Sequence, residues 1–256
     1  MKQALVALAL FAAGIAVADV TSSNTVGYNK STTGADNNFC TVPFFSIGYN
    51  TSDIQLITLD DGNAGTIGWG TENFSIWEGI PTVKEGSEFF YWDPSQDPTQ
   101  KATTYYWGDD VGNKVSFSVD AGQGVVINCA EGLKVQAQGD VPAGPVSFTT
   151  IADNNFTGNP FPHPIDIQNI KIDDGDAGSI GWGTENFSIW EGVPTVKEGS
   201  EFFYWDPSQD PTQKATTYYW GDDVGNKVSY PIAAGQGVVI NCAADLTVTM
   251  TPPYSL

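Results

Sequence analysis

The sequence predicts an all-β protein made of two tandem domains with the same fold, a β-sandwich or a barrel-like sheet. Three observations predict it: a long internal repeat, short segments in which apolar and polar residues alternate, and frequent turn residues between these segments. No stretch beyond residue 18 has a sustained helical period. Many short strands separated by turns are typical of sandwiches and barrels.

The internal repeat is nearly perfect over its central part. Residues 62–130 match residues 175–243 at a constant offset of 113, and 62 of the 69 positions are identical. Self-similarity on this scale indicates that one structural unit occurs twice. The seven pairs that differ are Asn63/Asp176, Thr66/Ser179, Ile80/Val193, Phe117/Tyr230, Ser118/Pro231, Val119/Ile232 and Asp120/Ala233.

A looser match upstream places the domain boundaries. Residues 35–39 reappear as residues 152–156, so the second unit begins well before the strict repeat. We predict domain 1 at residues 19–140, with an N-terminal strand, and domain 2 at residues 141–256. Each is close to the usual domain size and is long enough to bury its own core.

Two segments of domain 1 show the clearest strand pattern. Residues 115–119 and 133–138 alternate between apolar and polar side chains, a period of two residues that places the apolar ones on one face. Pro231 replaces Ser118 at an outward position, which predicts an edge strand because proline has no N–H to donate. The other strands predicted in domain 1 are residues 54–59, 74–77, 88–92, 103–107 and 124–129.

Residues 1–18 are predicted to form a secretory signal peptide. Lys2 supplies the positive start, residues 4–17 are apolar, and Ala16-Val17-Ala18 has the small-x-small form of a cleavage site. The apolar run is shorter than the roughly 20 residues that span a bilayer, so no membrane span is expected. We therefore expect a secreted protein, extracellular or on the cell surface, whose mature chain starts at Asp19.

The chain is strongly acidic. It has 30 Asp and Glu residues against 10 basic residues, and its net charge is −20. The basic residues are all lysines, and loss of Lys2 with the signal peptide would leave a net charge of −21. A surface of this sign repels nucleic acid and anionic lipid, so neither is expected as a partner, whereas cations are attracted.

Two acidic turns contain candidate calcium ligands. Asp61 and Asn63 in domain 1, and Asp174 and Asp176 in domain 2, form the pattern D-x-[DN]-x-G, which places two oxygen ligands on one loop. The spacing differs from that of an EF-hand loop. Asp, Asn and Gly are also ordinary turn residues, so the sequence leaves open whether these loops bind Ca²⁺ or serve as turns only.

All eight tryptophans lie in the repeat, four in each domain. Neighbouring residues of a strand face opposite sides, so the aromatic runs at residues 88–92 and 103–107 must place rings on both faces. One set would fill the core. The other would either form aromatic ladders that stabilise the sheet or remain open to a ligand such as a glycan ring. The candidate ligand-binding residues are Trp92, Trp107, Trp205 and Trp220.

Catalysis is not expected. The chain has one histidine, His163, and domain 1 has none, so neither a Ser/His/Asp nor a Cys/His arrangement can form there. A zinc site with the usual nitrogen and sulfur ligands is excluded in domain 1 for the same reason. Glu72, Glu78, Glu85 and Glu88 could in principle act in pairs, as in glycosidases, but they are more simply interpreted as solvated charges.

The three cysteines allow one disulfide at most within the chain. One interpretation is a Cys40–Cys129 bridge that closes domain 1 and leaves Cys242, the repeat equivalent of Cys129, as a free thiol. The other interpretation is three buried, reduced thiols. The spacing of the cysteines does not choose between them.

Several segments resemble a tandem β-domain that is common in secreted surface proteins of some bacteria. These segments are Gly158-Asn159-Pro160-Phe161-Pro162, then Ile167, Ile170, Trp190, Tyr204 and Trp220, and last Ala234–Val239 with its G-x-G. Domain 1 departs from the opening motif, because it has Thr41-Val42-Pro43-Phe44-Phe45. The resemblance implies a β-rich extracellular module without catalysis, and it brings no binding residues with it.

These observations favour a non-enzymatic structural protein of the cell surface or extracellular space that associates with itself. Two nearly identical domains present the same surface twice, which favours head-to-tail contacts and avidity. Residues 20–28 could add a strand to their own domain or to a neighbouring molecule. The alternative is a tandem carbohydrate-binding module that holds an extracellular polysaccharide on one aromatic face per domain; a glycan-cleaving enzyme is the least favoured hypothesis.

Overall fold

The computed structural model describes residues 26–34, 36–44, 51–62, 65–68, 70–78, 82–120, 122–175, 178, 180–181, 183–191 and 195–256. The predicted signal peptide, residues 1–18, lies outside these ranges. Within them, all regular structure is β-strand apart from four 3₁₀ turns of three residues each. The predicted all-β class is therefore confirmed.

Domain 1 is a sandwich of antiparallel strands. Five strands form one sheet in the order β2-β9-β5-β6-β7, three form a second sheet in the order β1-β10-β4, and β3 pairs with β8 in a short ribbon. The elements are β1 (Val26–Thr32), β2 (Asp36–Thr41), β3 (Thr51–Asp53), η1 (Ile54–Leu56), β4 (Ile57–Asp60), β5 (Asn73–Ser75), β6 (Phe89–Trp92), η2 (Pro94–Gln96), β7 (Tyr106–Gly108), β8 (Ser118–Asp120), β9 (Gly124–Cys129) and β10 (Lys134–Asp140).

Domain 2 repeats this arrangement. Its sheets have the orders β12-β19-β15-β16-β17 and β11-β20-β14, with the ribbon β13-β18. The elements are β11 (Val146–Thr149), β12 (Asp153–Gly158), β13 (Ile165–Asp166), η3 (Ile167–Asn169), β14 (Ile170–Asp173), β15 (Asn186–Ser188), β16 (Phe202–Trp205), η4 (Pro207–Gln209), β17 (Tyr219–Gly221), β18 (Pro231–Ile232), β19 (Gly237–Cys242) and β20 (Thr247–Met250). The domain boundary predicted after residue 140 falls between β10 and β11.

The segment predicted as one strand over residues 54–59 is divided. Its first half forms the 3₁₀ turn η1, and β4 begins only afterwards. The cause is Asp53, whose side chain accepts a hydrogen bond from the Gln55 N–H at 2.8 Å and so caps the turn. Domain 2 has the same break at η3, capped by Asp166.

Alternation along β6 places aromatic rings on both faces of the sheet. Phe89 and Tyr91 point into the core and are buried, whereas Phe90 and Trp92 lie on the other face and are half-buried. The core face carries the larger energetic weight, because burying an aromatic side chain removes its whole apolar surface from water. The equivalent strand β16 has the same pattern.

The polar atoms of the core aromatics join the two sheets of each domain. Trp107, on β7, donates from Nε1 to the Ile57 carbonyl on β4 at 2.8 Å. The hydroxyl of Tyr91, on β6, accepts from the Leu59 N–H on β4 at 3.1 Å. Buried polar groups need such partners, so the two hydrogen bonds fix how the five-stranded sheet lies over the three-stranded one.

Two expectations about edge strands can be compared with the structure. Pro231 lies on β18, which pairs with β13 in a two-stranded ribbon, so the proline is on an edge as predicted. Of the predicted N-terminal strand at residues 20–28, residues 26–28 belong to β1 and pair with β10 of their own domain. Residues 20–25 lie outside the described residues.

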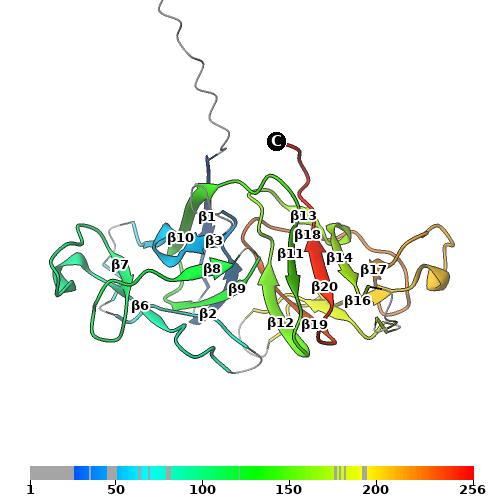
Figure 1. The fold of residues 1–256 in the computed structure, drawn as a ribbon, viewed down its shortest axis with the longest axis horizontal. Helices are drawn as coiled ribbons and strands as arrows, with labels where there is room; N and C mark the ends of the chain where they lie inside the picture. Colours follow the sequence, from blue (N-terminus) through cyan, green and yellow to red (C-terminus); the bar gives the residue numbers. More distant parts are fainter. Residues whose placement is uncertain are drawn as a thin grey trace, which may run out of the picture.

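The two domains meet through equivalent strands, with β2 and β9 lying against β12 and β19. Cys40 forms a bridge with Gln236, and Thr157, the counterpart of Cys40, forms one with Gln123, the counterpart of Gln236. Each contact thus occurs twice with the roles exchanged, which defines a pseudo-two-fold axis. The two domains extend to opposite sides of this axis (Figure 1).

Glycine permits the close approach of the two backbones at this interface. A Cβ atom on Gly124 would lie 2.6 Å from the carbonyl carbon of Phe156, and one on Gly237 would lie 2.5 Å from that of Phe39. Ordinary carbon–carbon contacts are about 3.5 to 4.0 Å. Any larger residue at either position would therefore push the domains apart.

Four aromatic side chains fill the centre of the interface. Phe39 and Phe156 stack with their ring centroids 5.7 Å apart. Trp77 and Trp190 meet this pair edge-on, at centroid distances of 5.9 to 6.2 Å. Stacked and edge-to-face arrangements at these distances are the favoured geometries of aromatic pairs. Two of the eight tryptophans thus hold the domains together, a role that the sequence did not predict.

One pair at the interface breaks the symmetry. Thr41 and Gly158 occupy equivalent positions, opposite Gly124 and Gly237 in their respective sheets. A Cβ atom on Gly158 would lie 2.7 Å from Cγ2 of Thr41. The added Cβ would also lie 2.5 Å from the carbonyl oxygen of Gln236 in its own domain, so both neighbours favour glycine at position 158.

Candidate functional sites at the tips and in the groove between the domains

Each domain has a tight turn after β7 or β17, two strands that lie toward opposite ends of the molecule (Figure 1). We call the turns Asp109–Asn113 and Asp222–Asn226 the tip turns. Asp109 organises the first one: its N–H donates to the Asn113 carbonyl at 3.0 Å, and its Oδ1 accepts from the N–H groups of Val111 and Asn113 at 3.1 and 2.7 Å. Asp222 makes the same bonds in domain 2.

Charge and packing both hold the tip turn in place. Partial burial raises the pKa of Asp109, but hydrogen bonds from the side chain and backbone of Asn113 outweigh it, and the net shift is downward. Beneath the turn, Trp92 Nε1 donates to the Asp109 carbonyl at 3.0 Å, and the Tyr106 hydroxyl donates to the Gly112 carbonyl at 2.8 Å. The turn is therefore preorganised.

The apex of each tip turn exposes a valine. Val111 is 69% exposed and Val224 is 68% exposed, so both apolar side chains are accessible to solvent. The neighbouring Tyr105 stacks on the buried Tyr91 with the centroids 5.5 Å apart, and one edge of it remains accessible. A rigid turn with an apolar apex is suited to contact with another surface because little ordering entropy is lost on binding.

A second carboxylate supports the tip from the preceding loop. Asp97 is buried and accepts from the hydroxyl and N–H of Thr99 at 2.6 and 2.8 Å, and from the N–H groups of Lys101 and Ala102 at 3.0 and 2.7 Å. The Thr99 hydroxyl and these N–H groups lower the pKa of Asp97 to about 2, against a smaller opposing effect of desolvation. Asp210 has the same partners and the same pKa in domain 2.

The candidate calcium ligands serve as turn residues where the structure describes them. Asp61 Oδ2 accepts from the N–H groups of Thr66 and Ile67 at 2.8 and 3.3 Å, and Asp174 Oδ2 accepts from the Ile180 N–H at 3.2 Å. Within the described ranges, no three His, Cys, Asp or Glu side chains form a group that could hold a metal ion. Their predicted partners Asn63 and Asp176 lie outside those ranges, so calcium binding stays a prediction.

The tryptophans proposed as ligand-binding residues divide into two pairs. Trp107 and Trp220 are 0% exposed and belong to the core, so their assignment to a ligand-binding face is wrong. Trp92 and Trp205 are half-buried, and the ring of Trp92 lies close to Gly70 and Gly108, where an added Cβ would be 3.0 and 2.9 Å away. Together with its hydrogen bond to Asp109, this packing makes Trp92 a support of the tip turn.

A hollow beside the tip of domain 2 keeps an aromatic ring accessible. It measures about 350 Å³ and is lined by Tyr218, Asp206, Ser208 and Gln209. Tyr218 stacks on Tyr204 with the centroids 5.5 Å apart. The side chains of Tyr218 and Asp206 interact, which lowers the pKa of Asp206 after the larger effect of its hydrogen bonds from Ser208. An aromatic ring beside a carboxylate and an amide is a combination of groups that can bind a sugar.

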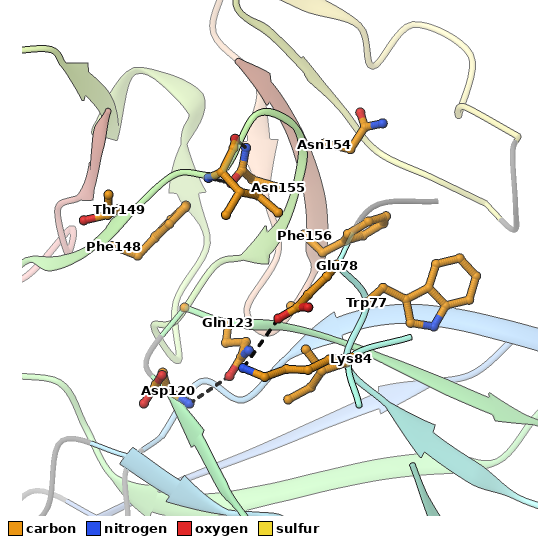
Figure 2. A pocket seen from close by; sticks show the side chains of 14 residues that line it. Trp77, Glu78, Lys84, Asp120, Gln123, Phe148, Thr149, Asn154, Asn155 and Phe156 are labelled. Carbon is orange, nitrogen blue, oxygen red and sulfur yellow. Dashed lines mark hydrogen bonds and ion pairs between the residues drawn. The ribbon is translucent and has the colours of Figure 1, made fainter. Parts of the chain in front are cut away.

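A groove of about 280 Å³ lies between the two domains. Domain 1 contributes Glu78, Lys84, Asp120 and Gln123 on one side, and these face Phe148, Asn155 and Phe156 of domain 2 on the other (Figure 2). The Lys84 ammonium lies 3.7 Å from Glu78 Oε1, and Gln123 Oε1 accepts from the Asp120 N–H at 3.2 Å. The groove combines apolar rings with charged and amide groups, a composition typical of small-molecule sites.

The three cysteines are free thiols, so of the two interpretations that the sequence left open, the Cys40–Cys129 bridge is wrong. The strand register is the reason. Cys40 is paired with Val125 on β9, four residues before Cys129, and Cys129 is paired with Asp36. Four residues of strand span about 13 Å, well beyond the reach of a disulfide. Burial raises the pKa of Cys40 to about 12 and that of Cys242 to about 11, so neither thiol is activated.

The carboxylates considered for catalysis do not form a pair in one cleft. Glu72 is buried and accepts from the Gly68 N–H at 3.0 Å, so its interpretation as a solvated charge is wrong. Glu78 pairs with Lys84, while Glu85 and Glu88 are exposed. His163 is exposed on domain 2.

No protein-family model matches the sequence, and comparisons with characterised proteins and with solved structures return no significant match. No helix among the described residues is long and apolar enough to cross a membrane.

Proposed function

We propose that the protein is a secreted, non-catalytic structural protein that associates with itself through its two tip turns. The observation that carries the proposal is the pseudo-two-fold arrangement, which relates two tip turns of identical sequence that follow β7 and β17, toward opposite ends of the molecule (Figure 1). Secretion rests on the targeting segment predicted at residues 1–18. The absence of catalysis rests on the residue inventory, with a single histidine in the chain.

The geometry makes each molecule a unit with two equivalent ends. If a tip binds another tip, every molecule can join two neighbours, and a linear assembly grows without any further contact. The interface between the domains keeps the two tips at a fixed separation, because glycine backbones and four aromatic rings are interlocked there. A rigid unit with two ends is suited to building an extended structure.

Charge sets the conditions under which tips would meet. The chain carries a net charge of −20, and each tip turn has two adjacent aspartates, Asp109 and Asp110 or Asp222 and Asp223. Two such tips repel one another at low ionic strength, where the Debye length is about 30 Å at 0.01 M salt. Self-association should therefore strengthen as salt or a divalent cation screens the aspartates.

The test is the mass of the mature chain by light scattering, in low and high salt and with millimolar Ca²⁺, for three tip variants. Unchanged protein should form polymers, Val111→Asp alone and Val224→Asp alone should stop at dimers, and the double variant should stay monomeric. Assembly that stops at dimers would identify the tip turns as the binding surfaces, because a molecule with one unchanged tip turn can bind only one neighbour.

The matched control is Val196→Asp, which adds the same charge at a valine that is 40% exposed and lies outside the tip turns. It should assemble like the unchanged protein. A strict monomer for the unchanged protein under every condition, or assembly that the tip variants leave intact, would refute self-association through the tips.

A second candidate is a tandem carbohydrate-binding module, favoured by the hollow lined by Tyr218, Asp206 and Gln209. Domain 1 has the identical residues Tyr105, Asp93 and Gln96. Two equivalent sites per chain are then expected. Polysaccharide should quench tryptophan fluorescence with a stoichiometry of two, and Tyr105→Ala with Tyr218→Ala should abolish the change.

A further inference from the structure

We infer that the groove between the domains is a binding site for one neutral pyranose unit, and that it occurs once per chain. The inference is independent of self-association, because the groove lies beside the pseudo-two-fold axis and not at the tips. It rests on an asymmetry between this groove and its counterpart on the other side of the axis.

The counterpart groove can be identified residue by residue from the strand register. Phe148 is paired with Val248 on β20, and Ser31 is paired with Val135, the repeat equivalent of Val248, so Phe148 corresponds to Ser31. The N–H of Ile151 donates to Asn155 Oδ1 at 2.8 Å. The N–H of Gly34 donates to Asn38 Oδ1 at 2.7 Å in the same arrangement, so Ile151 corresponds to Gly34.

Three residues that line this groove have different counterparts in the strand register. Asp120, Phe148 and Ile151 correspond to Ala233, Ser31 and Gly34. The other side chains that line the groove, such as Trp77, Lys84 and Gln123, have identical counterparts.

Divergence at Asp120 is informative because this position lies in the nearly identical repeat, whereas Phe148 and Ile151 lie outside it. The strict repeat keeps 62 of 69 positions, and two of its differences change a charged group, Asn63/Asp176 and Asp120/Ala233. Of these, Asp120 lines the groove. Asp120 is exposed, and within the described part of the chain its carboxylate makes no ion pair. Domain 2 has alanine at this position and still forms the equivalent ribbon, although its strand β18 ends one residue earlier, at Ile232. This groove therefore has an exposed carboxylate that the counterpart lacks, and it lies beside Phe148, a ring that also packs against the core of domain 2.

The chemistry of these additions matches a sugar ring. The rings of Phe148 and Phe156 offer apolar surface to the C–H face of a pyranose. Asp120 can accept charge-assisted hydrogen bonds from hydroxyl groups, and Gln123 and Lys84 provide further polar contacts along the same side (Figure 2). The volume of about 280 Å³ is at the lower end of small-molecule sites, which suits one ring rather than a long chain.

Charge selects among sugars. The groove carries Glu78, Lys84 and Asp120, and Lys84 is already paired with Glu78, so the local net charge is negative. The whole chain is also strongly negative. Uronic acids and sulfated or phosphorylated sugars are therefore repelled, and a neutral pyranose is the expected ligand.

The experiment is calorimetric titration of the full mature chain with a panel of neutral methyl pyranosides of gluco, galacto, manno and N-acetylglucosamine configuration. At least one should bind with a stoichiometry of one per chain. Asp120→Ala should weaken binding by about tenfold or more, because a hydrogen bond to a charged group is lost. Glu191→Ala, which removes one negative charge from the counterpart groove, should leave the affinity unchanged.

A second variant distinguishes loss of the binding site from misfolding of the protein. Ala233→Asp with Ser31→Phe and Gly34→Ile copies the three side chains into the counterpart groove and should raise the stoichiometry to two. A Cβ on Gly34 would meet its nearest neighbour, Asn38 Oδ1, at 3.8 Å, an ordinary contact. Absence of binding by every pyranoside, two sites in the unchanged chain, or full affinity in Asp120→Ala would each overturn the inference.

Discussion

Replacing Gly124 by alanine should separate the two domains. The added Cβ would lie 2.6 Å from the carbonyl carbon of Phe156 and 2.7 Å from the nitrogen of Thr157, both backbone atoms that cannot rotate away. A normal contact needs about 3.5 Å or more, so the domains must move apart by about 1 Å at this point. Gly124 has no positive φ, so backbone strain does not contribute.

The cost can be estimated from the contacts that the movement disturbs. Overpacking of this kind costs about 1 to 3 kcal/mol. The displacement also loosens the Phe39–Phe156 stack and the hydrogen bond from Thr157 Oγ1 to the Gly122 carbonyl. Gly124→Ala and Gly237→Ala should each lower the free energy of unfolding by this amount, or the melting temperature by about 2 to 4 °C per kcal/mol.

The double variant gives the sharper test. Both clashes are relieved by the same separation of the domains, so Gly124→Ala with Gly237→Ala should cost less than the sum of the single changes. Calorimetry would measure the loss, and small-angle X-ray scattering would measure the separation. The control is Gly144→Ala, where an added Cβ meets nothing within 4 Å. The reasoning fails if Gly124→Ala melts and scatters like this control.

Three further predictions concern the carboxylates, the core and the thiols. Because the folded-state pKa of Asp97 and Asp210 is about 2, below the ordinary 3.8, ionisation stabilises the fold above pH 3.8, and this contribution is lost as the pH falls toward 2. The melting temperature should therefore decrease between pH 3.8 and pH 2. This decrease should be smaller in the double variant Asp97→Asn with Asp210→Asn. Trp107→Ala should cost about 3 to 5 kcal/mol in denaturant titrations and leave ligand binding by the folded fraction unchanged; a smaller loss would contradict its place in the core. All three thiols should be unreactive toward a thiol reagent in the native protein, and all three should react after unfolding without reductant. If only one thiol reacts in the unfolded protein, the other two form a disulfide.

Local pattern was sufficient for the fold where one face of a strand is buried. The aromatic run of β6 alternates between core and surface as the sequence predicts, and the segment at residues 124–129 forms β9 with those bounds. The segment at residues 54–59 misled the prediction because apolar content alone cannot reveal the turn that Asp53 initiates. The sequence also could not show whether Trp107 faces the core. Neighbouring rings on a strand must face opposite sides, but the sequence does not show which side is buried.

The candidate sites were harder to predict because they depend on how the domains meet. The second acidic turn was visible in the sequence as Asp109–Asn113, but its role as the rigid end of the molecule follows from the pseudo-two-fold arrangement. The groove was missed altogether, since Asp120 and Phe148 belong to different domains and no local motif joins them. One signal was available: Asp120 is replaced by alanine in the other copy, one of two positions in the strict repeat where the copies differ in charge.

The pair Thr41 and Gly158 has a consequence for assembly of the chain itself. Nearly identical neighbours in one polypeptide risk pairing with the wrong partner during folding. Two domains of the first type would bring two threonines into the space that holds one, and two of the second type would leave a gap there. The mismatch makes the two halves complementary rather than interchangeable, so a duplicated sequence acquires a defined partner preference through a single side chain.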